Sequence, residues 1–200
     1  MHPLSLFRFC PKCGSERFVP HNDKSKHCEA CGFTYYINPA AATVALIERP
    51  ASYQSSNGKL SNGQIEWLCV RRAKEPAKGT LDLPGGFSDL YETSEEGVMR
   101  EVKEETGLDV AALEFLFSIP NQYVYSGFTV HTMDMFYRCR VNSCEGARAA
   151  DDAGELLWLR PEDIHPEDFG LLSIRKGITQ LLQQYTNTLQ PHDDAREFLA

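Results

Sequence analysis

The side chains most suited to chemistry in this chain are three glutamates within one short segment. Glu101, Glu104 and Glu105 have the spacing i, i+3 and i+4, which places their carboxylates on one face of a helix. Carboxylates this close repel one another, so at least one would bind a proton unless a cation neutralised them. Mg²⁺ prefers oxygen ligands and is commonly shared between carboxylates and substrate phosphates. The spacing predicts a divalent-metal site for phosphate chemistry, and the alternative is an acidic helix that faces solvent.

The helix that must carry these glutamates has clear ends in the sequence. Thr93 is a suitable N-cap, and Glu96 three residues later completes a capping box. Gly107 is a suitable C-terminal glycine. Val102 and Leu108 point away from the glutamates and can pack on a sheet. We therefore predict a helix that ends at Gly107 and turns Glu105 toward solvent and metal.

The glutamates belong to a longer pattern that follows Leu83-Pro84-Gly85. It reads Gly86-x5-Glu92-x7-Arg100-Glu101-Val102-x-Glu104-Glu105-x-Gly107-Leu108. At these residues the chain resembles the Nudix hydrolases, and every fixed position of their signature box is present. The resemblance implies an α/β (α+β) fold, the Nudix α/β/α sandwich with a mixed sheet. It also implies hydrolysis of a nucleoside diphosphate linked to another moiety.

The resemblance further implies roles for the residues of the box. Glu101, Glu104 and Glu105 would bind Mg²⁺ or Mn²⁺, and one of them, Glu101 being the first candidate, would accept a proton from the attacking water. Glu92 would support the site or bind a further metal. Arg100 would orient a glutamate of the box through a charge-assisted pair.

Further residues near the box are candidates for substrate contact. The backbone of Gly85 and Gly86 would lie close to the metal and phosphates, where a side chain would obstruct. Arg71 and Arg72 would contact phosphate, with plain surface charge as the alternative. Glu155 is a candidate late base or metal contact.

A second group of metal-binding residues lies near the N-terminus. Cys10 and Cys13 are followed, after 14 residues, by Cys28 and Cys31. Two Cys-x-x-Cys pairs are typical of a structural zinc site with four thiolates. Two disulfides are the alternative. No signal peptide is evident and three cysteines are left over, which favours a reducing compartment and a cytoplasmic location.

Length and composition set limits on organisation and partners. The 200 residues suit one domain and a small module, which we assign as a zinc ribbon at 1–36, a Nudix domain at 37–186 and a tail at 187–200. A net charge of −8 makes nucleic-acid binding an unfavoured expectation, and no apolar run approaches a membrane span. Apolar runs and alternation predict strands at 42–48, 65–72, 80–83, 113–119, 129–141 and 155–159. Asn57-Gly58 and Asn62-Gly63 mark a hairpin loop, and the spacing at 171–185 predicts a last helix. Because no flexible linker follows the ribbon, we expect it to pack on the main domain.

The substrate must be inferred from residues outside the box. A four-cysteine ribbon before a Nudix domain resembles the NADH pyrophosphatase group, whose habit suggests a homodimer. That group carries Ser-Gln-Pro-Trp-Pro-Phe-Pro after the box, where this chain has Ser118-Ile119-Pro120-Asn121-Gln122-Tyr123. Ser118 and Pro120 match, but the remaining departures mean that NADH specificity does not carry over intact. Tyr123 would stack on a base, or else is an ordinary core aromatic.

We therefore expect hydrolysis of a dinucleotide-type pyrophosphate such as NADH or ADP-ribose. One alternative is a nucleoside triphosphate pyrophosphohydrolase that clears damaged nucleotides. Another is a module that senses nucleotides without catalysis, against which the intact glutamates argue. A further alternative is an RNA-end processor, which the net charge of −8 disfavours.

Overall fold

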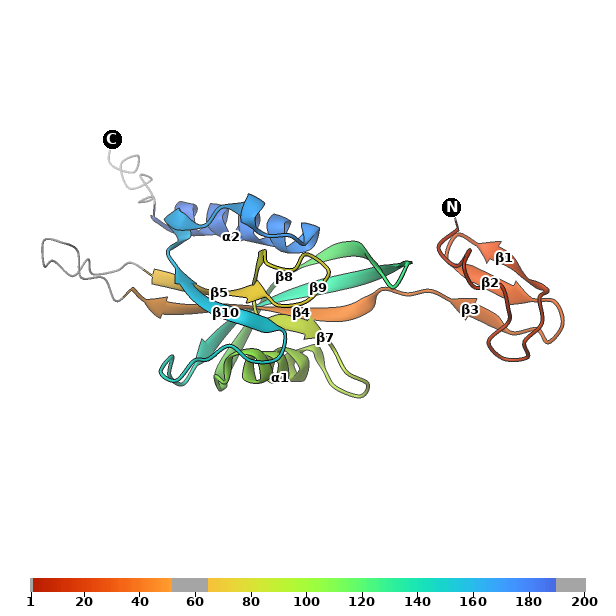
Figure 1. Cartoon of the computed structure of the whole chain (residues 1–200), viewed down its shortest axis with the longest axis horizontal. Helices are drawn as coiled ribbons and strands as arrows, with labels where there is room; N and C mark the ends of the chain where they lie inside the picture. The colour runs from red at the N-terminus through yellow and green to blue at the C-terminus, as the bar shows by residue number, and fades with distance from the viewer. Residues whose placement is uncertain (1, 52–64, 190–200) are drawn as a thin grey trace, which may run out of the picture.

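The computed structural model describes residues 2–51 and 65–189. Figure 1 shows a small N-terminal ribbon joined to a larger body in which a sheet lies between two helices. The ribbon contains β1 (Phe18–Asn22), β2 (Ser25–Cys28) and β3 (Thr34–Tyr36). The body contains β4 (Ala40–Pro50), β5 (Ile65–Arg72), β6 (Leu81–Asp82), β7 (Gly85–Phe87), α1 (Ser94–Thr106), β8 (Val110–Tyr125), β9 (Phe128–Val141), β10 (Ala153–Leu159), the 3-10 turns η1 (Pro161–Asp163) and η2 (Pro166–Asp168), and α2 (Leu172–Leu189).

The main sheet is mixed, as the family resemblance implied. Its strand order is β10-β5-β4-β9-β8, with β6 paired to β5 and β7 paired to β4. The pair β4–β9 is parallel, whereas the others in this sheet are antiparallel. The short strand β7 therefore places the glycine turn beside β4, in the middle of the sheet.

Helices on both faces of the sheet complete the predicted α/β/α sandwich. Alternate residues of β4 are buried on opposite faces, which explains why its sequence is a continuous apolar run. Val44 and Leu46 pack in the core beneath α2, while Ala45 and Ile47 pack in the core beneath α1. The two cores fix both helices against one sheet.

The expected elements differ from the observed ones mainly at their ends. The strand expected at 113–119 is much longer, because β8 forms an extended hairpin with β9 from Val110 to Tyr125. The last helix continues to Leu189, so the tail predicted from residue 187 begins too early. The predicted hairpin loop at Asn57-Gly58 and Asn62-Gly63 lies outside the described residues, as do residues 190–200.

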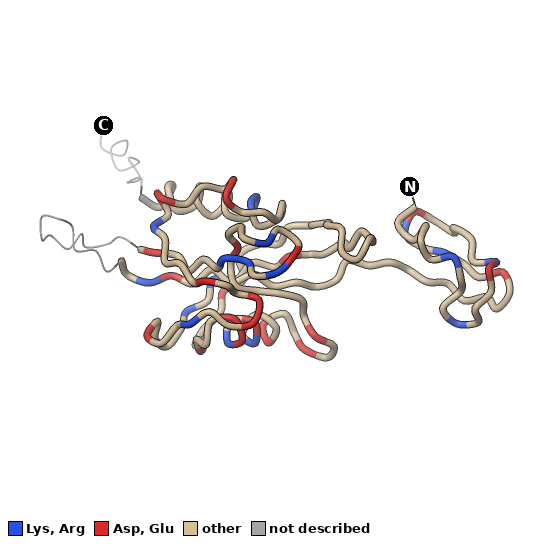
Figure 2. The backbone as a smooth tube through the Cα atoms, viewed as in Figure 1, with Lys and Arg blue, Asp and Glu red and all other residues tan. Residues whose placement is uncertain are grey.

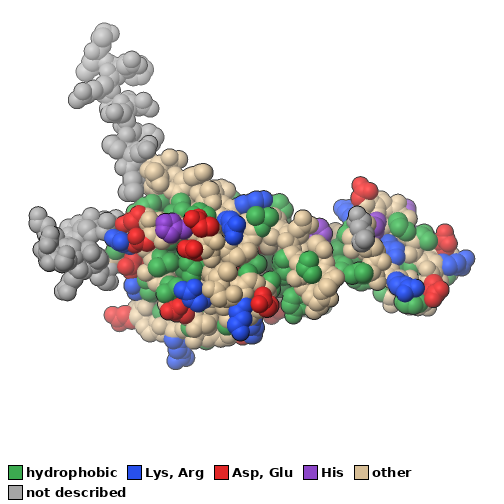
Figure 3. All heavy atoms as spheres, turned by 45° about the horizontal axis from the view of Figure 1, so that its top comes forward, with side chains coloured by type: hydrophobic (Ala, Val, Ile, Leu, Met, Phe, Trp, Pro, Cys, Tyr) green, Lys and Arg blue, Asp and Glu red, His purple; other side chains and the backbone are tan. Residues whose placement is uncertain are grey.

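The ribbon meets the body at the tip of the β8–β9 hairpin and does not lie over the main sheet (Figures 1 and 3). The ring of Phe7 contacts that of Phe128 with centroids 5.4 Å apart, and it also stacks near Tyr35 at 6.1 Å. The expectation that the ribbon packs on the main domain therefore holds only at this tip. Within residues 2–51 and 65–189, no helix has the length and apolarity that crossing a membrane requires.

Candidate active site and zinc cluster

Helix α1 is held at both ends by the caps that the sequence predicted. Thr93 Oγ1 accepts from the backbone N–H of Glu96 at 3.2 Å, and Glu96 Oε2 accepts from the backbone N–H of Thr93 at 2.7 Å. Gly107 has φ of 74° and donates its N–H to the carbonyl of Lys103 at 2.9 Å. Val102 is fully buried against the sheet. These contacts fix the rotation of the helix and hence the direction of its glutamates.

Strand β7 brings a glycine backbone directly against two of the glutamates. The N–H of Gly85 donates to Glu105 Oε2 at 3.0 Å. A Cβ on Gly86 would lie 2.6 Å from Glu101 Oε1. Gly85 has φ of 153°, and a Cβ there would lie 2.0 Å from the carbonyl oxygen of Thr43. Gly85 therefore cannot carry a side chain, and a side chain on Gly86 would require the carboxylate of Glu101 to move.

Arg100 is the cationic centre of the box. Its guanidinium donates to both carboxylate oxygens of Glu92, at 2.7 and 3.1 Å, and its Nη1 donates to Glu101 at 2.8 Å and Glu104 at 3.0 Å. Its Nη2 also donates to the carbonyl of Phe87 at 2.9 Å. Figure 2 shows Asp and Glu gathered on α1 and on the loop before it. The fork geometry of Arg100 orients three carboxylates at once.

The position of Glu105 corrects the expectation that it faces solvent. Its side chain lies inward, with the residue only 6% exposed, because α1 presses it against β7. Burial, together with the nearby negative charges of Asp82, Glu101 and Asp152, raises the pKa of Glu105 to about 8, although the hydrogen bond from Gly85 opposes this shift. Burial also raises the pKa of Glu101, which the Arg100 charge opposes.

These carboxylates fit a hard divalent cation. Their oxygens are the donors that Mg²⁺ and Mn²⁺ prefer, and a cation would relieve the desolvation and repulsion felt by Glu101 and Glu105. In the structure, Glu101 and Glu104 are turned to Arg100 and Glu105 to the N–H of Gly85. The joint binding of one cation by all three stays a prediction.

A cavity of about 410 Å³ opens beside the glycine strand. Five of the residues predicted to act line it: Gly85, Gly86, Glu105, Arg72 and Tyr123. The ring of Tyr123 lies near that of Phe87, with centroids 6.5 Å apart. The cavity is therefore lined by a carboxylate, by bare glycine backbone and by aromatic rings.

Ser118 is placed apart from these residues. It is exposed on β8, opposite Met135, and does not line the cavity. Asn121 and Tyr123, on alternate positions of the same strand, do line it. Strand alternation turns Ser118 to the other face of the sheet, so the geometry gives no support to its predicted substrate contact.

The two predicted phosphate-binding arginines differ in the same way. Arg72 lines the cavity, and its Nη1 donates to Asp82 Oδ2 at 2.6 Å. Arg71 points outward and pairs with Glu155 at 2.9 Å, and neither of these two residues lines the cavity. Strand alternation places Arg72, the arginine chosen as a substrate contact, at the cavity and turns Arg71 away from it.

Sequence reasoning missed other polar residues of the cavity. Lys74 and Asp152 line its rim and form an ion pair. Deeper in the cavity lie Asn121, Thr132 and Asp134 from the β8–β9 hairpin. Their polar character within alternating strands was visible in the sequence, but no spacing rule placed them together.

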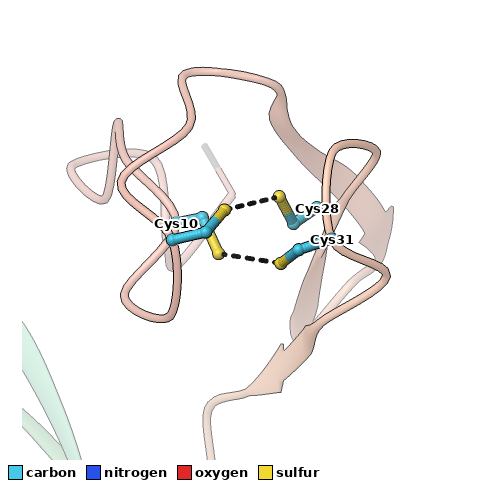
Figure 4. Close-up of side chains that lie close together, drawn as sticks. Cys10, Cys28 and Cys31 are labelled. Atoms are coloured by element: carbon cyan, nitrogen blue, oxygen red, sulfur yellow. Dashed lines mark hydrogen bonds between the residues drawn. The ribbon is translucent and has the colours of Figure 1, made fainter.

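The four N-terminal cysteines converge on one point (Figure 4). Their sulfur atoms all lie within 4.8 Å of one another, with Cys10–Cys31 at 3.8 Å and Cys13–Cys28 at 3.7 Å. Disulfide sulfurs would be about 2.05 Å apart. Tetrahedral zinc with Zn–S bonds of about 2.3 Å would hold its sulfurs roughly 3.8 Å apart. The quartet thus fits a closed zinc ribbon and excludes the disulfide alternative for these residues.

Parts of this chain are similar in sequence to known proteins. An ADP-ribose pyrophosphatase of Methanocaldococcus jannaschii is 37% identical over 110 residues, which cover 54% of this chain and 53% of that protein. The NAD-capped RNA hydrolase NudC of Vibrio vulnificus is 25% identical over 119 residues, covering 60% of this chain and 40% of that protein. The chain thus spans about half or less of the length of these relatives.

The fold has close counterparts among solved structures. The crystal structure of a NUDIX hydrolase from Nitrosomonas europaea superposes with a TM-score of 0.63 at 20% identity, covering 90% of this chain and 93% of that one. The sequence of this chain matches the NUDIX domain over residues 59–181, which include the whole glutamate box. With the capped helix, the glycine strand and the sandwich fold in place, this match shows that the chain belongs to the Nudix family.

Proposed function

We propose that this protein is a pyrophosphohydrolase that cleaves the P–O–P bond of a nucleoside diphosphate linked to another moiety, of the ADP-ribose or NADH type. One observation carries the proposal. A single cavity joins the glycine backbone and Glu105 of the box to the aromatic rings of Phe87 and Tyr123. Such a cavity can hold a pyrophosphate at one side and a base or ring at the other.

The cation bound by Glu101, Glu104 and Glu105, Mg²⁺ or Mn²⁺, would neutralise charge on the phosphoryl oxygens and lower the pKa of a water. Residues of the chain position the phosphates and accept the proton. Gly85 and Gly86 let phosphates approach the backbone closely. A carboxylate of the box, Glu101 being the first candidate, accepts the proton of the attacking water.

Positive charge at the rim complements the substrate phosphates. Lys74 and Arg72 both line the cavity, and each is held by a carboxylate, Asp152 and Asp82 respectively. These pairs keep the cations oriented in a chain whose net charge is −8. We assign phosphate contact to Arg72 and Lys74 on this ground.

The size of the cavity and the names of the relatives support the substrate class. Its volume of about 410 Å³ is that of a pocket for a small ligand and not for a polymer. ADP-ribose and an NAD cap, which appear in the names of the relatives, are both built around a pyrophosphate. The shared element is the nucleoside diphosphate, so it is the core of the proposed substrate.

The test is a hydrolysis panel with Mg²⁺ or Mn²⁺. The substrates are ADP-ribose, NADH, NAD, FAD, a dinucleoside polyphosphate, an NAD-capped RNA and the nucleoside triphosphates. Release of AMP from ADP-ribose or NADH supports the proposal. Release of inorganic pyrophosphate from a triphosphate would instead support the alternative of a nucleoside triphosphate pyrophosphohydrolase. Tight nucleotide binding without turnover would support a sensing module.

A matched pair of variants ties turnover to the box. Glu101→Gln removes a proposed metal ligand and should lower turnover at least about 10²-fold. Glu167→Gln makes the same chemical change at an exposed glutamate in η2 and should leave turnover unchanged. Equal activity of both variants would contradict the assigned site.

The cysteines indicate the kind of cellular compartment in which the protein resides. A thiolate quartet that binds zinc needs reduced cysteines, so we assign the protein to a reducing compartment such as the cytoplasm. The homodimer suggested by the resemblance stays a prediction, which sedimentation equilibrium of the purified chain would measure.

A further inference from the structure

A buried polar network at the base of the cavity plays no part in the pyrophosphate chemistry above. Its centre is Asp134 on β9, which is 5% exposed. Asp134 accepts hydrogen bonds from Thr132 Oγ1 at 2.5 Å, from Ser173 Oγ at 2.5 Å and from Asn121 Nδ2 at 3.3 Å. The donors come from β9, α2 and β8, so the network joins one face of the long hairpin to the last helix.

This network fixes the orientation of the Asn121 amide. A carboxylate only accepts hydrogen bonds, so the NH₂ end of Asn121 must face Asp134 and its Oδ1 must face away. Asn121 is 9% exposed and lines the cavity. Within the described part of the chain, no group donates to Asn121 Oδ1. The cavity therefore presents Asn121 Oδ1 as an oriented and unpaired acceptor, and Thr43, whose buried Oγ1 also has no partner among the described residues, is a second polar residue of its lining.

The surroundings of this acceptor suit a flat ring. Tyr123 follows two residues later on the same face of β8, and its ring lies near that of Phe87. Val130, Leu171 and Ile174 add apolar lining. Rings and aliphatic side chains attract a planar base without reading its edge, whereas the oriented Asn121 acceptor beside them can read it.

We propose that Asn121 is a specificity residue whose Oδ1 accepts a hydrogen bond from the exocyclic amino group of the substrate base. The site then takes an amino-bearing base of the adenine type in preference to the same base with an oxo group. An oxo group would place acceptor against acceptor and leave Asn121 Oδ1 unpaired. Asp134 is the positioning residue that holds the amide. This inference rests on the proposed function and adds the identity of the substrate's nucleobase.

ADP-ribose and inosine diphosphate ribose test this inference, because they differ by one amino group for one oxo group and contain no second base. The wild-type protein should show kcat/KM at least about tenfold higher for ADP-ribose. Asn121→Ala should bring the ratio close to one, mainly through KM. Gln122→Ala changes the neighbouring, exposed residue of β8 and should leave the ratio unchanged. Equal kcat/KM in the wild type, or an unaltered ratio in Asn121→Ala, would overturn the inference.

Asp134→Asn separates positioning from stability. It retains the size of the side chain but offers an NH₂ group, so the Asn121 amide is free to turn over. The amino-to-oxo ratio should fall, whereas a purely structural role would lower both activities by the same factor and refute the positioning assignment. If Asp134→Asn fails to fold, as judged by circular dichroism, the Asn121→Ala comparison decides alone.

Failure of the proposed function would be recognised separately. If neither diphosphate ribose is hydrolysed, calorimetry with AMP and IMP tests the inference, and the hydrolase proposal itself fails only if NADH is not hydrolysed either. Tighter binding of AMP in the wild type, lost in Asn121→Ala, would support it. Equal affinities, or no binding of either nucleotide, would overturn it.

Discussion

Burial and neighbouring negative charges both disfavour the ionised form of Glu105. Its carboxylate is enclosed by α1 and β7 and accepts the N–H of Gly85, yet it faces the negative charges of Asp82 and Glu101. Folded proteins tolerate such a group where a ligand compensates for it. The cost of enclosing this carboxylate supports the prediction that Glu105 binds a metal.

Glu105→Gln should therefore separate activity from stability. The amide keeps an oxygen for the Gly85 N–H and removes a buried charge, so the melting temperature without added Mg²⁺ should stay equal or rise. Turnover of ADP-ribose with Mg²⁺ should fall at least about 10²-fold. Thermal melts and initial rates measure the two effects. Normal hydrolysis rates in Glu105→Gln would show that Glu105 is not a ligand of the catalytic metal.

Arg100 orders the carboxylates around it through a planar fork. Arg100→Lys keeps the charge, but one ammonium cannot hold Glu92, Glu101 and Glu104 together. We expect kcat to fall about tenfold or more and the melting temperature to drop. Lys103→Arg is the control, a charge-conserving change on the exposed part of the same helix. Unchanged kcat in Arg100→Lys would show that orientation by the fork is dispensable.

At the scale of elements, the site is the contact between strand β7 and helix α1. The two glycines of β7 face different neighbours, although they are adjacent in the sequence. A side chain on Gly85 meets backbone of β4, which cannot move aside, whereas one on Gly86 meets the flexible end of Glu101. An added side chain should therefore lower stability at Gly85, whereas at Gly86 it should mainly displace Glu101.

Gly85→Ala and Gly86→Ala test this difference. Gly85→Ala should lower the free energy of unfolding by more than about 1 kcal/mol, because its φ and the clash with Thr43 both oppose a side chain. Gly86→Ala should leave the fold nearly as stable but displace Glu101 and lower kcat. Urea unfolding and initial rates distinguish the two. Equal loss of stability in both variants would contradict the geometry.

Helix α1 and the hairpin β8–β9 show which elements the sequence could predict. The ends of α1 were predicted correctly, because its caps are local contacts between residues a few positions apart. The length of β8 was underestimated, because its polar outer half is stabilised by pairing with β9. That outer half carries Asn121, whose place in the cavity was therefore missed, although Tyr123 two residues later was predicted.

At the scale of the whole molecule, the ribbon and the sandwich have separate cores. Cys10, Phe18 and Cys28 form the small core of the ribbon, whereas the two large cores belong to the sandwich. Figure 3 shows the ribbon as a lobe joined to the body by a narrow neck. Such an arrangement predicts two independent unfolding units.

Zinc removal tests this independence. A zinc chelator should unfold the ribbon, because bound zinc contributes about 10–16 kcal/mol to folding of such modules. The main melting transition and the hydrolase activity in excess Mg²⁺ should remain. Limited proteolysis should then cut within residues 2–36 and spare the rest. Loss of the main transition on chelation would show that the ribbon supports the sandwich.

The sequence by itself determined the chemistry: a glutamate box on a capped helix, and a cysteine quartet that fits zinc. Both depend on spacing within one segment, where the helical repeat or a tight turn dictates which side chains converge. Only the tertiary structure decided that Glu105 is buried, that Arg72 and not Arg71 faces the cavity, and that Asp134 orients Asn121. These facts depend on the pairing of strands and the docking of α2, which bring together residues far apart in the chain.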